Sequence, residues 1–529
     1  MSAGCSVDLS QTTQQTDAAV YEIIDRQWDD DLGTKANYHI SDASPEPNSL
    51  QVMEVSPPEF GVLTMPQAVA FATGHNRQYH TEKENLYLTA LDFTDVRHFY
   101  EPMPFIGADG GYFKDGDKKA TAGNANFGFE QLLATGAQVG SNISLGWIDI
   151  LSGDYRSGFS TVASAVITQP LMRGAGRKVA LENLTQAERN TLYQIRAFNR
   201  YRKEFVTSIM SEYYLVLQLN DRQSNTRNHF YALVDTYENL RKRAVAGRLP
   251  QHELEQANQD KLDAFSEYIQ AQKEYKNALD EFKLQLALHP AEDFQLDRGE
   301  FDALKESVWK PIRISEEEAA KIALDQRLDL ANAADMAIDA ERKVDVAADA
   351  IRAELNLIGI ADTQTLDSRT TSEYYELSLQ LDLPIDRLTE KNAYRRALIV
   401  LMQQQRGHQE LTDRVVLEVR RSYREMREAY QRYKNEQNAH QLAQERTKNT
   451  QLLLRYDRAN TRDVLDARED LLKAQNAATS ALLDYAVASL EFFRDTGVMK
   501  VKPDGMWEQS MPPQINMTAA KSAEPYVAQ

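Results

Sequence analysis

The chain has 529 residues and a formal net charge of −19, from 60 lysines and arginines against 79 aspartates and glutamates. This acidic balance argues against nucleic acid and against an anionic membrane surface as the main partners. The single cysteine excludes disulfides within one chain and thiolate zinc sites. We therefore expect a folded protein whose organisation comes from long periodic segments.

The N-terminal region, residues 1–62, is rich in Ser, Thr, Gln and Asp and contains one short amphipathic piece, Val20–Trp28. This composition predicts a tether or wrapping segment. Cys5 follows Ser-Ala-Gly, which resembles the end of a bacterial lipoprotein signal, where the cysteine is acylated after cleavage. No apolar segment precedes it, so on this interpretation the sequence starts late. The alternative is an unmodified thiol on a terminal segment, and both interpretations stay open.

The first regular element begins at Thr64–Gln67, a capping box with proline in its first turn, and we expect one helix from there to about Phe99. Between about 105 and 170 the apolar period changes to two and turn residues become frequent. This pattern predicts two long strands or four shorter ones, without deciding between them. A helix of about 70 residues then follows, with a turn at 247–250 and a return helix to about 290.

The return helix occurs twice. From Asp463 to Phe493, apolar and aromatic residues recur every third or fourth position, which is the seam of a helix packed along another helix. The same lattice lies 210 residues earlier without a gap, with only Lys261 out of character. Its members are Leu254, Ala257, Lys261, Ala264, Tyr268, Ala271, Tyr275, Ala278 and Phe282. This predicts an internal duplication.

The second half repeats the plan of the first. A second capping box starts at Ser315, strands are expected at about 354–384, and a second long helix turns near Tyr456. We therefore expect five parts, which are an extension, a first repeat, a linker, a second repeat and a tail. Their bounds are 1–62, 63–290, 291–314, 315–496 and 497–529.

Strands that alternate apolar and polar residues, flanked by very long helices, suit a membrane barrel. One chain offers four to six strands and such barrels need about eight or more, so we expect several chains to close one barrel. The plan resembles TolC-like outer-membrane efflux proteins over residues 63–496. Two segments carry the resemblance: Thr168-Gln-Pro-Leu-Met-Arg-Gly174 at the first strand-to-helix junction, and Asp463-Val-Leu-Asp-Ala467 after the second tip turn.

The resemblance implies a mainly helical fold with a β-barrel portion. It implies a homotrimer in the bacterial outer membrane, with a 12-stranded barrel in lipid and an α-helical tunnel through the periplasm. It further implies a passive duct in a multipart efflux or secretion system, docked to a periplasmic adaptor (a membrane fusion protein) and an inner-membrane pump. The alternative is a soluble, elongated coiled-coil scaffold or a periplasmic adaptor.

The candidate site is the tip of the two helical hairpins, interpreted as the periplasmic end and gate of the tunnel. In the resembled family, glycine commonly occupies both tip turns, and Asp457 departs from this. The alternative is a pair of ordinary turns with solvated charges, and Asp463 could be a first-turn residue favoured by the helix dipole. The tip candidates are Gly247, Arg248, Pro250, Tyr456, Asp457, Arg458, Asp463 and Asp466. The strand-to-helix junction candidates are Pro170, Gly174 and Pro384.

We expect no catalytic, cofactor or metal site. The nine histidines are scattered, His75 and His80 lie five apart, and no His-Glu-x-x-His motif occurs. The glycine-bearing segment 173–177 lacks the Lys-Ser/Thr of a phosphate-binding loop and is better explained as a flexible junction. The sequence therefore favours a protein that is not an enzyme.

Overall fold

The computed structural model describes residues 9–29, 32–33, 35, 38–40, 61–115, 117–152, 158–247, 249–306, 314–366, 370–383, 385–456 and 458–502. Four predicted site residues, Cys5, Arg248, Pro384 and Asp457, lie outside these described residues. The chain forms two units, one of residues 1–29, 85–197 and 329–411 and one of the remainder. Among the described residues, no helix combines the length and the apolar composition needed to cross a membrane.

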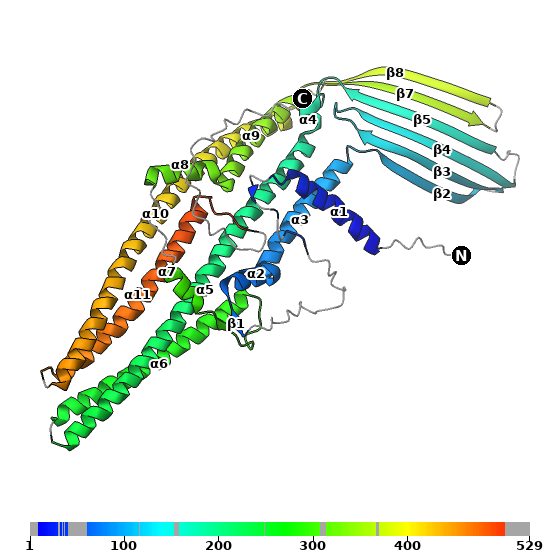
Figure 1. The fold of residues 1–529 in the computed structure, drawn as a ribbon. Helices are drawn as coiled ribbons and strands as arrows, with labels where there is room; N and C mark the ends of the chain where they lie inside the picture. The colour runs from blue at the N-terminus through cyan, green and yellow to red at the C-terminus, as the bar shows by residue number, and fades with distance from the viewer. Residues whose placement is uncertain are drawn as a thin grey trace. The chain divides into compact units, whose positions relative to one another are not determined.

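The first unit contains a six-stranded sheet in the order β2-β3-β4-β5-β7-β8, with every neighbouring pair antiparallel (Figure 1). Four strands come from the first predicted strand region, which settles the choice between two and four. Six strands are two more than the four per chain that a 12-stranded trimer implies. The strands are β2 (Met103–Asp115), β3 (Lys118–Leu132), β4 (Gln138–Ser152), β5 (Gly158–Pro170), β7 (Glu354–Leu366) and β8 (Thr370–Asp382).

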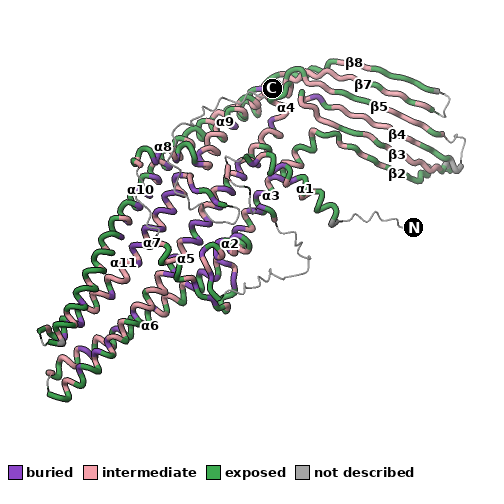
Figure 2. Tube along the Cα trace, viewed as in Figure 1, coloured by how far each residue is buried: buried purple, intermediate pink, exposed green. Residues whose placement is uncertain are grey.

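The register of the sheet sorts its side chains onto two faces, because directly paired residues share a face and successive residues alternate. One face is apolar and carries Ile106, Phe127, Phe129, Ile143, Leu145, Trp147, Phe159, Ile167, Leu357, Leu377, Leu379 and Leu381. The other face carries most of the polar side chains of the sheet, together with Phe105, Phe113, Ile148, Val166, Ile358 and Ile360; its polar members are Asp109, Asn124, Asn126, Asn142, Ser144, Ser160, Ser164, Asp362, Gln364, Ser378 and Gln380. Ile106 is 89% exposed and Leu377 is 77% exposed, so the apolar face is not covered within the chain (Figure 2).

The N-terminal helix α1 (Leu9–Gln27) is longer than the amphipathic piece expected from the sequence. It packs on α3 (Arg77–His98), where the Tyr87 hydroxyl donates a hydrogen bond of 2.5 Å to the Asp17 carboxylate. The rings of Tyr21 and Tyr87 lie 5.8 Å apart between centroids. Part of the predicted tether is therefore a docked helix.

The single helix expected from Thr64 to Phe99 was wrong, because α2 (Met65–His75) ends at Asn76 and α3 starts afterwards. The Asn76 side chain stabilises this break with two hydrogen bonds. Its amide donates to the Gln285 carbonyl at 2.7 Å, and its oxygen accepts from the Tyr79 N–H at 3.0 Å. The same extended break occurs 251 positions later at Arg327, between α8 (Glu316–Gln326) and α9 (Leu328–Asp349).

Two helical hairpins dominate the second unit. The long helices are α5 (Glu182–Val245) and α10 (Leu388–Arg455), with 64 and 68 residues. The return helices α6 (Gln251–Gln285) and α11 (Thr461–Asp495) both have 35 residues and begin and end 210 positions apart. Seam residues such as Ala257 and Ala467 are buried, as the predicted lattice requires.

The duplication extends to individual hydrogen bonds where the return helices end. In the first half, the Tyr213 hydroxyl donates to the Leu63 carbonyl at 3.0 Å. In the second half, Tyr423 donates to the Ile314 carbonyl at 2.9 Å. The second unit is completed by α7 (Gly299–Glu306) and by a parallel pair of short strands, β1 (Val62–Leu63) and β6 (Gln295–Leu296).

Candidate functional site

The first hairpin tip is closed by glycine geometry. Gly247 has a φ of +70°, a conformation that L side chains rarely adopt, and its N–H donates to the Ala244 carbonyl at 2.9 Å. Pro250 precedes α6 with a φ of −63° at the N-cap position, where it offers no side-chain acceptor. The first tip is therefore a tight turn set by the backbone.

The second hairpin tip is closed by side-chain capping. Asn460 is the N-cap of α11, and its N–H donates to the Asp463 carboxylate at 2.9 Å. Before it, the Arg458 N–H donates to the Leu453 carbonyl at 2.9 Å, and Tyr456 is 71% exposed. Asp463 therefore caps the first turn of α11. Asp466 lies 3.7 Å from Arg462 on the exposed side of the same helix.

The beginning of the second return helix packs against the first hairpin. Leu465 of α11 joins Leu233 and Leu240 of α5 and Ala257 and Ala264 of α6 in one buried cluster. The two tips consequently lie side by side within the second unit (Figure 1). Arg248 and Asp457, one in each tip turn, lie outside the described residues.

Three further carboxylates interact electrostatically with Asp260 near these tips. Burial raises the pKa of Asp260 on α6, and the charges of Asp263, Glu469 and Asp466 raise it further, while Arg462 opposes them. When ionised, these groups repel across the contact between α6 and α11 and weaken it. Of these four residues, only Asp466 is among the tip candidates predicted from the sequence; the position of Asp260 matches that of Asp470, 210 residues later in the second return helix.

A half-buried cation lies beside this acidic group. Burial lowers the pKa of Arg468 on α11, and the Asp235 charge opposes that shift. Burial and the Arg468 charge also lower the pKa of His229 on α5 to about 4, although Glu469 opposes them. The His229 ring is therefore neutral at pH 7 and does not take part in the charge balance of the tips.

The first strand-to-helix junction is held by a carboxylate from far along the chain. Pro170 is the last residue of β5, opposite Asn356 of β7, where its missing N–H is tolerated. Gly174 has a φ of +77°, and its N–H donates to the Asp349 carboxylate at 2.7 Å. Asp349 also pairs with Arg352 at 3.1 Å and is buried. The sequence contained no local signal for this contact, because the partners are 175 residues apart.

A buried charge network fixes α9 against the first part of α5. Asp339 is 3% exposed and accepts hydrogen bonds from Tyr193 at 2.6 Å and from Arg189 and Arg342 at 2.7 Å. Arg342 also pairs with Glu182 at 2.8 Å. Burial opposes ionisation of Asp339, but these donors outweigh it and lower its pKa. The network was missed by sequence reasoning and has the role of a structural tie.

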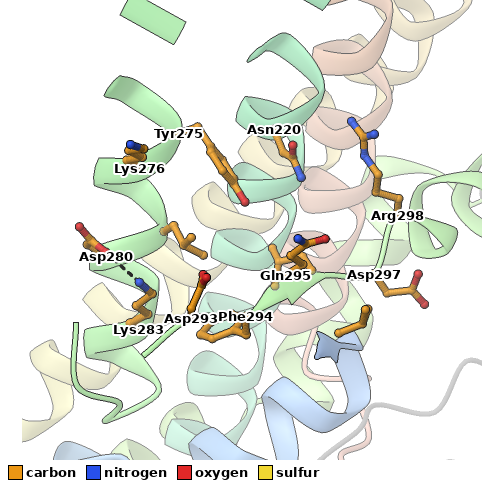
Figure 3. Close-up of a pocket in the computed structure, with 13 residues that line it drawn as sticks. Asn220, Tyr275, Lys276, Asp280, Lys283, Asp293, Phe294, Gln295, Asp297 and Arg298 are labelled. Carbon is orange, nitrogen blue, oxygen red and sulfur yellow. Dashed lines mark hydrogen bonds and ion pairs between the residues drawn. The ribbon is translucent and has the colours of Figure 1, made fainter. Parts of the chain in front are cut away.

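A groove of about 670 Å³ in the second unit lies beside α6, β6 and Asn220 of α5 (Figure 3). Tyr275 and Asn220 point into the same space, while Lys283 turns to Asp280 at 3.1 Å. The Lys283 ammonium also donates to the Pro290 carbonyl at 3.0 Å, so both of these partners of the ammonium are groups of the chain itself. In the part of the chain that the structure describes, no group of three or more His, Cys, Asp or Glu could hold a metal ion.

No protein-family model matches the sequence, and no curated protein matches it. Solved structures do match. The Neisseria gonorrhoeae MtrE outer membrane channel, in its open state, has a TM-score of 0.60 at 15% identity, covering 82% of this chain and 88% of that one. This chain has the fold of an outer-membrane channel.

Two more structures agree. The Campylobacter jejuni CmeC outer membrane channel has a TM-score of 0.58 at 14% identity, covering 84% of this chain and 87% of that one. The outer membrane protein VceC from Vibrio cholerae has a TM-score of 0.57 at 14% identity, covering 82% and 96%. The resemblance to TolC-like channels is therefore confirmed for the fold, which is mainly helical with an antiparallel sheet.

Proposed function

We propose that this protein is the outer-membrane exit duct of an efflux or secretion system. Three copies would form one barrel in the bacterial outer membrane and one helical tunnel in the periplasm. The duct is passive, because an inner-membrane pump supplies the energy and a periplasmic adaptor joins the pump to the tunnel. Cargo is then a small molecule or a protein that the pump selects.

The observation that carries this proposal is the two-faced sheet. Its apolar face has exposed large side chains on β2, β3, β4, β5 and β8, as a wall in contact with lipid requires, and the polar side chains of its other face suit a water-filled interior. In the described sheet, β2 and β8 each pair on one side only. Unpaired N–H and C=O groups cost several kcal/mol each in lipid, so these edges need strands from further copies.

The helical hairpins support the remaining parts of the proposal. Helices of 64 and 68 residues reach about 100 Å at ~1.5 Å per residue, a length suited to crossing an aqueous compartment. The paired tips, with Gly247, Arg248 and Pro250 on one side and Asp457 and Arg458 on the other, are our candidate surface for the adaptor and the gate. Ionised carboxylates between α6 and α11 would favour loosening of that end.

The soluble-scaffold alternative fits the apolar sheet poorly. A soluble protein rarely exposes an apolar patch beyond a few hundred Å². Exposed Ile106, Phe127, Trp147, Leu377 and Leu379 lie on a single face that spans all the strands from β2 to β8. A scaffold would need a separate partner to cover this face, whereas lipid covers it directly.

The test is the mass of the native protein extracted from membranes with and without detergent, measured by light scattering. We expect a trimer that depends on detergent. A monomer or dimer obtained without detergent would reject the duct. Two adjacent substitutions on β8 provide a matched control, since Leu379→Arg places a charge on the apolar face and Ser378→Arg places it on the polar face.

At mid-membrane depth, arginine on the lipid face costs about 2–4 kcal/mol. Leu379→Arg should therefore reduce the yield of membrane-inserted trimer, while Ser378→Arg should leave it close to the natural level. Equal yields from both variants would show that the apolar face does not meet lipid.

A further inference from the structure

We infer that all six strands of each chain are part of the barrel wall, so that three copies close an eighteen-stranded barrel, three times the six of one chain. This inference rests on the proposed trimer and specifies the assembly of its membrane portion. It replaces the twelve-stranded barrel that the sequence resemblance implied. The interaction surface is the β2 edge of one copy against the β8 edge of the next.

The additional strands are fully integrated in the sheet. β2 pairs with β3 from Met103↔Glu130 to Asp115↔Lys118, over the whole length of β2. β3 then pairs with β4 from Leu132↔Gln138 to Lys119↔Ser152, with one irregularity between Lys119 and Ala120. Such continuous ladders are as long as that between β7 and β8. A hairpin folded away from the wall would lose them.

The turn between β3 and β4 is locked to the strand-to-helix junction. Gly136 has a φ of +89°, and a Cβ there would lie 2.5 Å from the Gly174 carbonyl oxygen. The Gly176 N–H donates to the Thr135 carbonyl at 3.1 Å, and Thr135 and Gln169 are joined by a side-chain hydrogen bond of 3.1 Å. This close fit holds the inner strands at the same level as the end of β5.

The chain entering β2 is fixed at the same level. The Tyr100 hydroxyl donates to the Ala180 carbonyl at 2.8 Å, and the Gln131 amide donates to the Tyr100 carbonyl at 3.1 Å. Tyr100 therefore ties the start of β2 to the end of β3 and to α4 (Arg177–Ala180). The chain just before β2 and the end of β3, which lie near the helices, are thus both held by hydrogen bonds of Tyr100.

The apolar face continues through β2, β3 and β4 on the same side, although Phe105 and Phe113 of β2 lie on the other face. Ile106, Phe127 and Ile143 share one row on the apolar face. Asn124 and Ser144 lie on the polar face, where the Ser144 hydroxyl donates to the Asn124 side chain at 2.6 Å. These strands therefore meet the same two environments as β7 and β8, which is the requirement for a shared wall.

Strand order also permits the contact between copies. β2 leads away from α3 and β8 returns to α10, so β8 of one copy and β2 of the next run antiparallel when they lie side by side. Barrel diameter grows roughly in proportion to strand number, so eighteen strands give a lumen about 1.5-fold wider than twelve.

Disulfide cross-linking between neighbouring copies tests the edge contact. In a Cys5→Ser background, which removes the single natural cysteine, Asp109→Cys on β2 is combined in turn with Cys at five polar-face positions of β8. Five positions are scanned because the shear of the closed barrel, which a single chain does not define, sets which β8 residue lies opposite Asp109 of the next copy. The β8 positions are Ser372, Tyr374, Glu376, Ser378 and Gln380.

We expect covalent trimers from one or two of these pairs, because a disulfide needs Cβ atoms about 3.5–4.5 Å apart. The matched control is Ser144→Cys on β4 with the same five partners, which should give none. Cross-links from Ser144→Cys in place of Asp109→Cys would show that β2 and β3 are outside the wall and would overturn the inference.

Light scattering of the same samples separates the two proposals. A detergent-dependent trimer without cross-links in either series would reject the eighteen-stranded wall and leave the exit duct standing. A monomer in detergent would reject the duct and the wall together. Electron images of the trimer viewed along its axis provide a second measurement, with eighteen strands expected and twelve contradicting the inference.

Discussion

The two helical hairpins of the second unit are copies at one end and different at the other. Where α6 and α11 end, both contain the same aromatic pair 210 positions apart. These pairs are Tyr213–Phe282, with centroids 6.1 Å apart, and Tyr423–Phe492, at 5.9 Å. An interhelical ion pair is also repeated, as Arg222–Glu274 at 2.8 Å and Arg432–Asp484 at 2.6 Å. Both hairpins therefore repeat the same aromatic contact and the same interhelical ion pair near these ends.

Toward the tips, the equivalent positions carry different chemistry. The N-cap position has Pro250 in the first hairpin and Asn460 in the second. Asp470 pairs with Arg446 at 2.6 Å, but its counterpart Asp260 has Thr236 where the arginine would be. The difference teaches that the two hairpins share their main contacts at the packed end and differ more in chemistry at the tips, where we propose that partners dock.

The largest expected effect is at the shared aromatic pair. Phe282→Ala and Phe492→Ala each remove a ring that is at most 2% exposed, so each should lower the free energy of unfolding by about 3–5 kcal/mol. The measurement is denaturant unfolding of the detergent-solubilised protein. Leu284→Ala, at a 64% exposed position of α6, is the control and should change stability by less than about 0.5 kcal/mol. If the two Phe variants lost very different amounts of unfolding free energy, the aromatic pairs of the two hairpins would not be equivalent in energy.

The second prediction concerns a carboxyl present in only one hairpin. Burial of Glu212 and the nearby Glu281 charge raise its pKa to about 7, while a hydrogen bond from Gln285 opposes this. The folded chain then holds a proton that the unfolded chain loses above its ordinary pKa of 4.5. The free energy of unfolding should therefore fall as the pH rises from about 4.5 to about 7, by at most about 3 kcal/mol.

Glu212→Gln should flatten that pH dependence, as measured by unfolding at a series of pH values. Its amide oxygen can still accept from Gln285, so stability above pH 7 should rise. Glu212→Ala is the control, with the same flattening but a lower stability because the hydrogen bond is lost. The second hairpin has Ser422 at this position and lacks this contribution. An unchanged slope in Glu212→Gln would disprove the assigned proton.

The third prediction concerns the capping difference at the tips. Asp463→Ala removes the acceptor of the Asn460 N–H and should cost about 0.5–1.5 kcal/mol, the net worth of one hydrogen bond. Hydrogen exchange at the first turn of α11 should accelerate. Glu253→Ala, the equivalent change in the first hairpin, should have less effect because the N-cap residue of α6 is Pro250, which has no N–H for a carboxylate to accept from. A change in channel conductance without loss of protection would instead place Asp463 in the lumen.

Much of the architecture could be predicted from the sequence because it depends on local periodicity. The seam residues, the turn at Gly247 and the strand end at Pro170 all follow from spacing and backbone preference. Capping at Ser315 was likewise confirmed, since its side chain accepts from the Glu318 N–H at 3.2 Å. The alternation in β8 is local too, and it indicated the apolar face.

Other features could not be predicted, because they depend on partners far apart in the chain. The break at Asn76 is stabilised by a carbonyl at Gln285, and Gly174 is held by Asp349. Asp339 is buried only because residues of α5 reach it. The strand number was open for a similar reason. Glycine, serine and asparagine weaken the period-two signal in β3 and β4, and pairing across the sheet defines those strands.

The smallest expected effect concerns Lys261, the one departure from the predicted lattice. Its ammonium lies 4.2 Å from the centroid of the Tyr237 ring and donates to Asn258 at 2.8 Å, so a charge is accommodated in the seam by an aromatic face. Lys261→Met keeps the aliphatic stem and should cost about 0.5–1 kcal/mol. A double-mutant cycle with Tyr237→Leu should show coupling of that size. Lys273→Met, at an exposed position of the same helix, is the control.

The equivalent pair in the second hairpin, Thr447 and Leu471, contains no charge, so its own cycle should show none of this coupling. Zero coupling between Lys261 and Tyr237 would mean that the contact between the ammonium and the ring does not stabilise the first hairpin. The two seams would then have the same pairwise energy at this position.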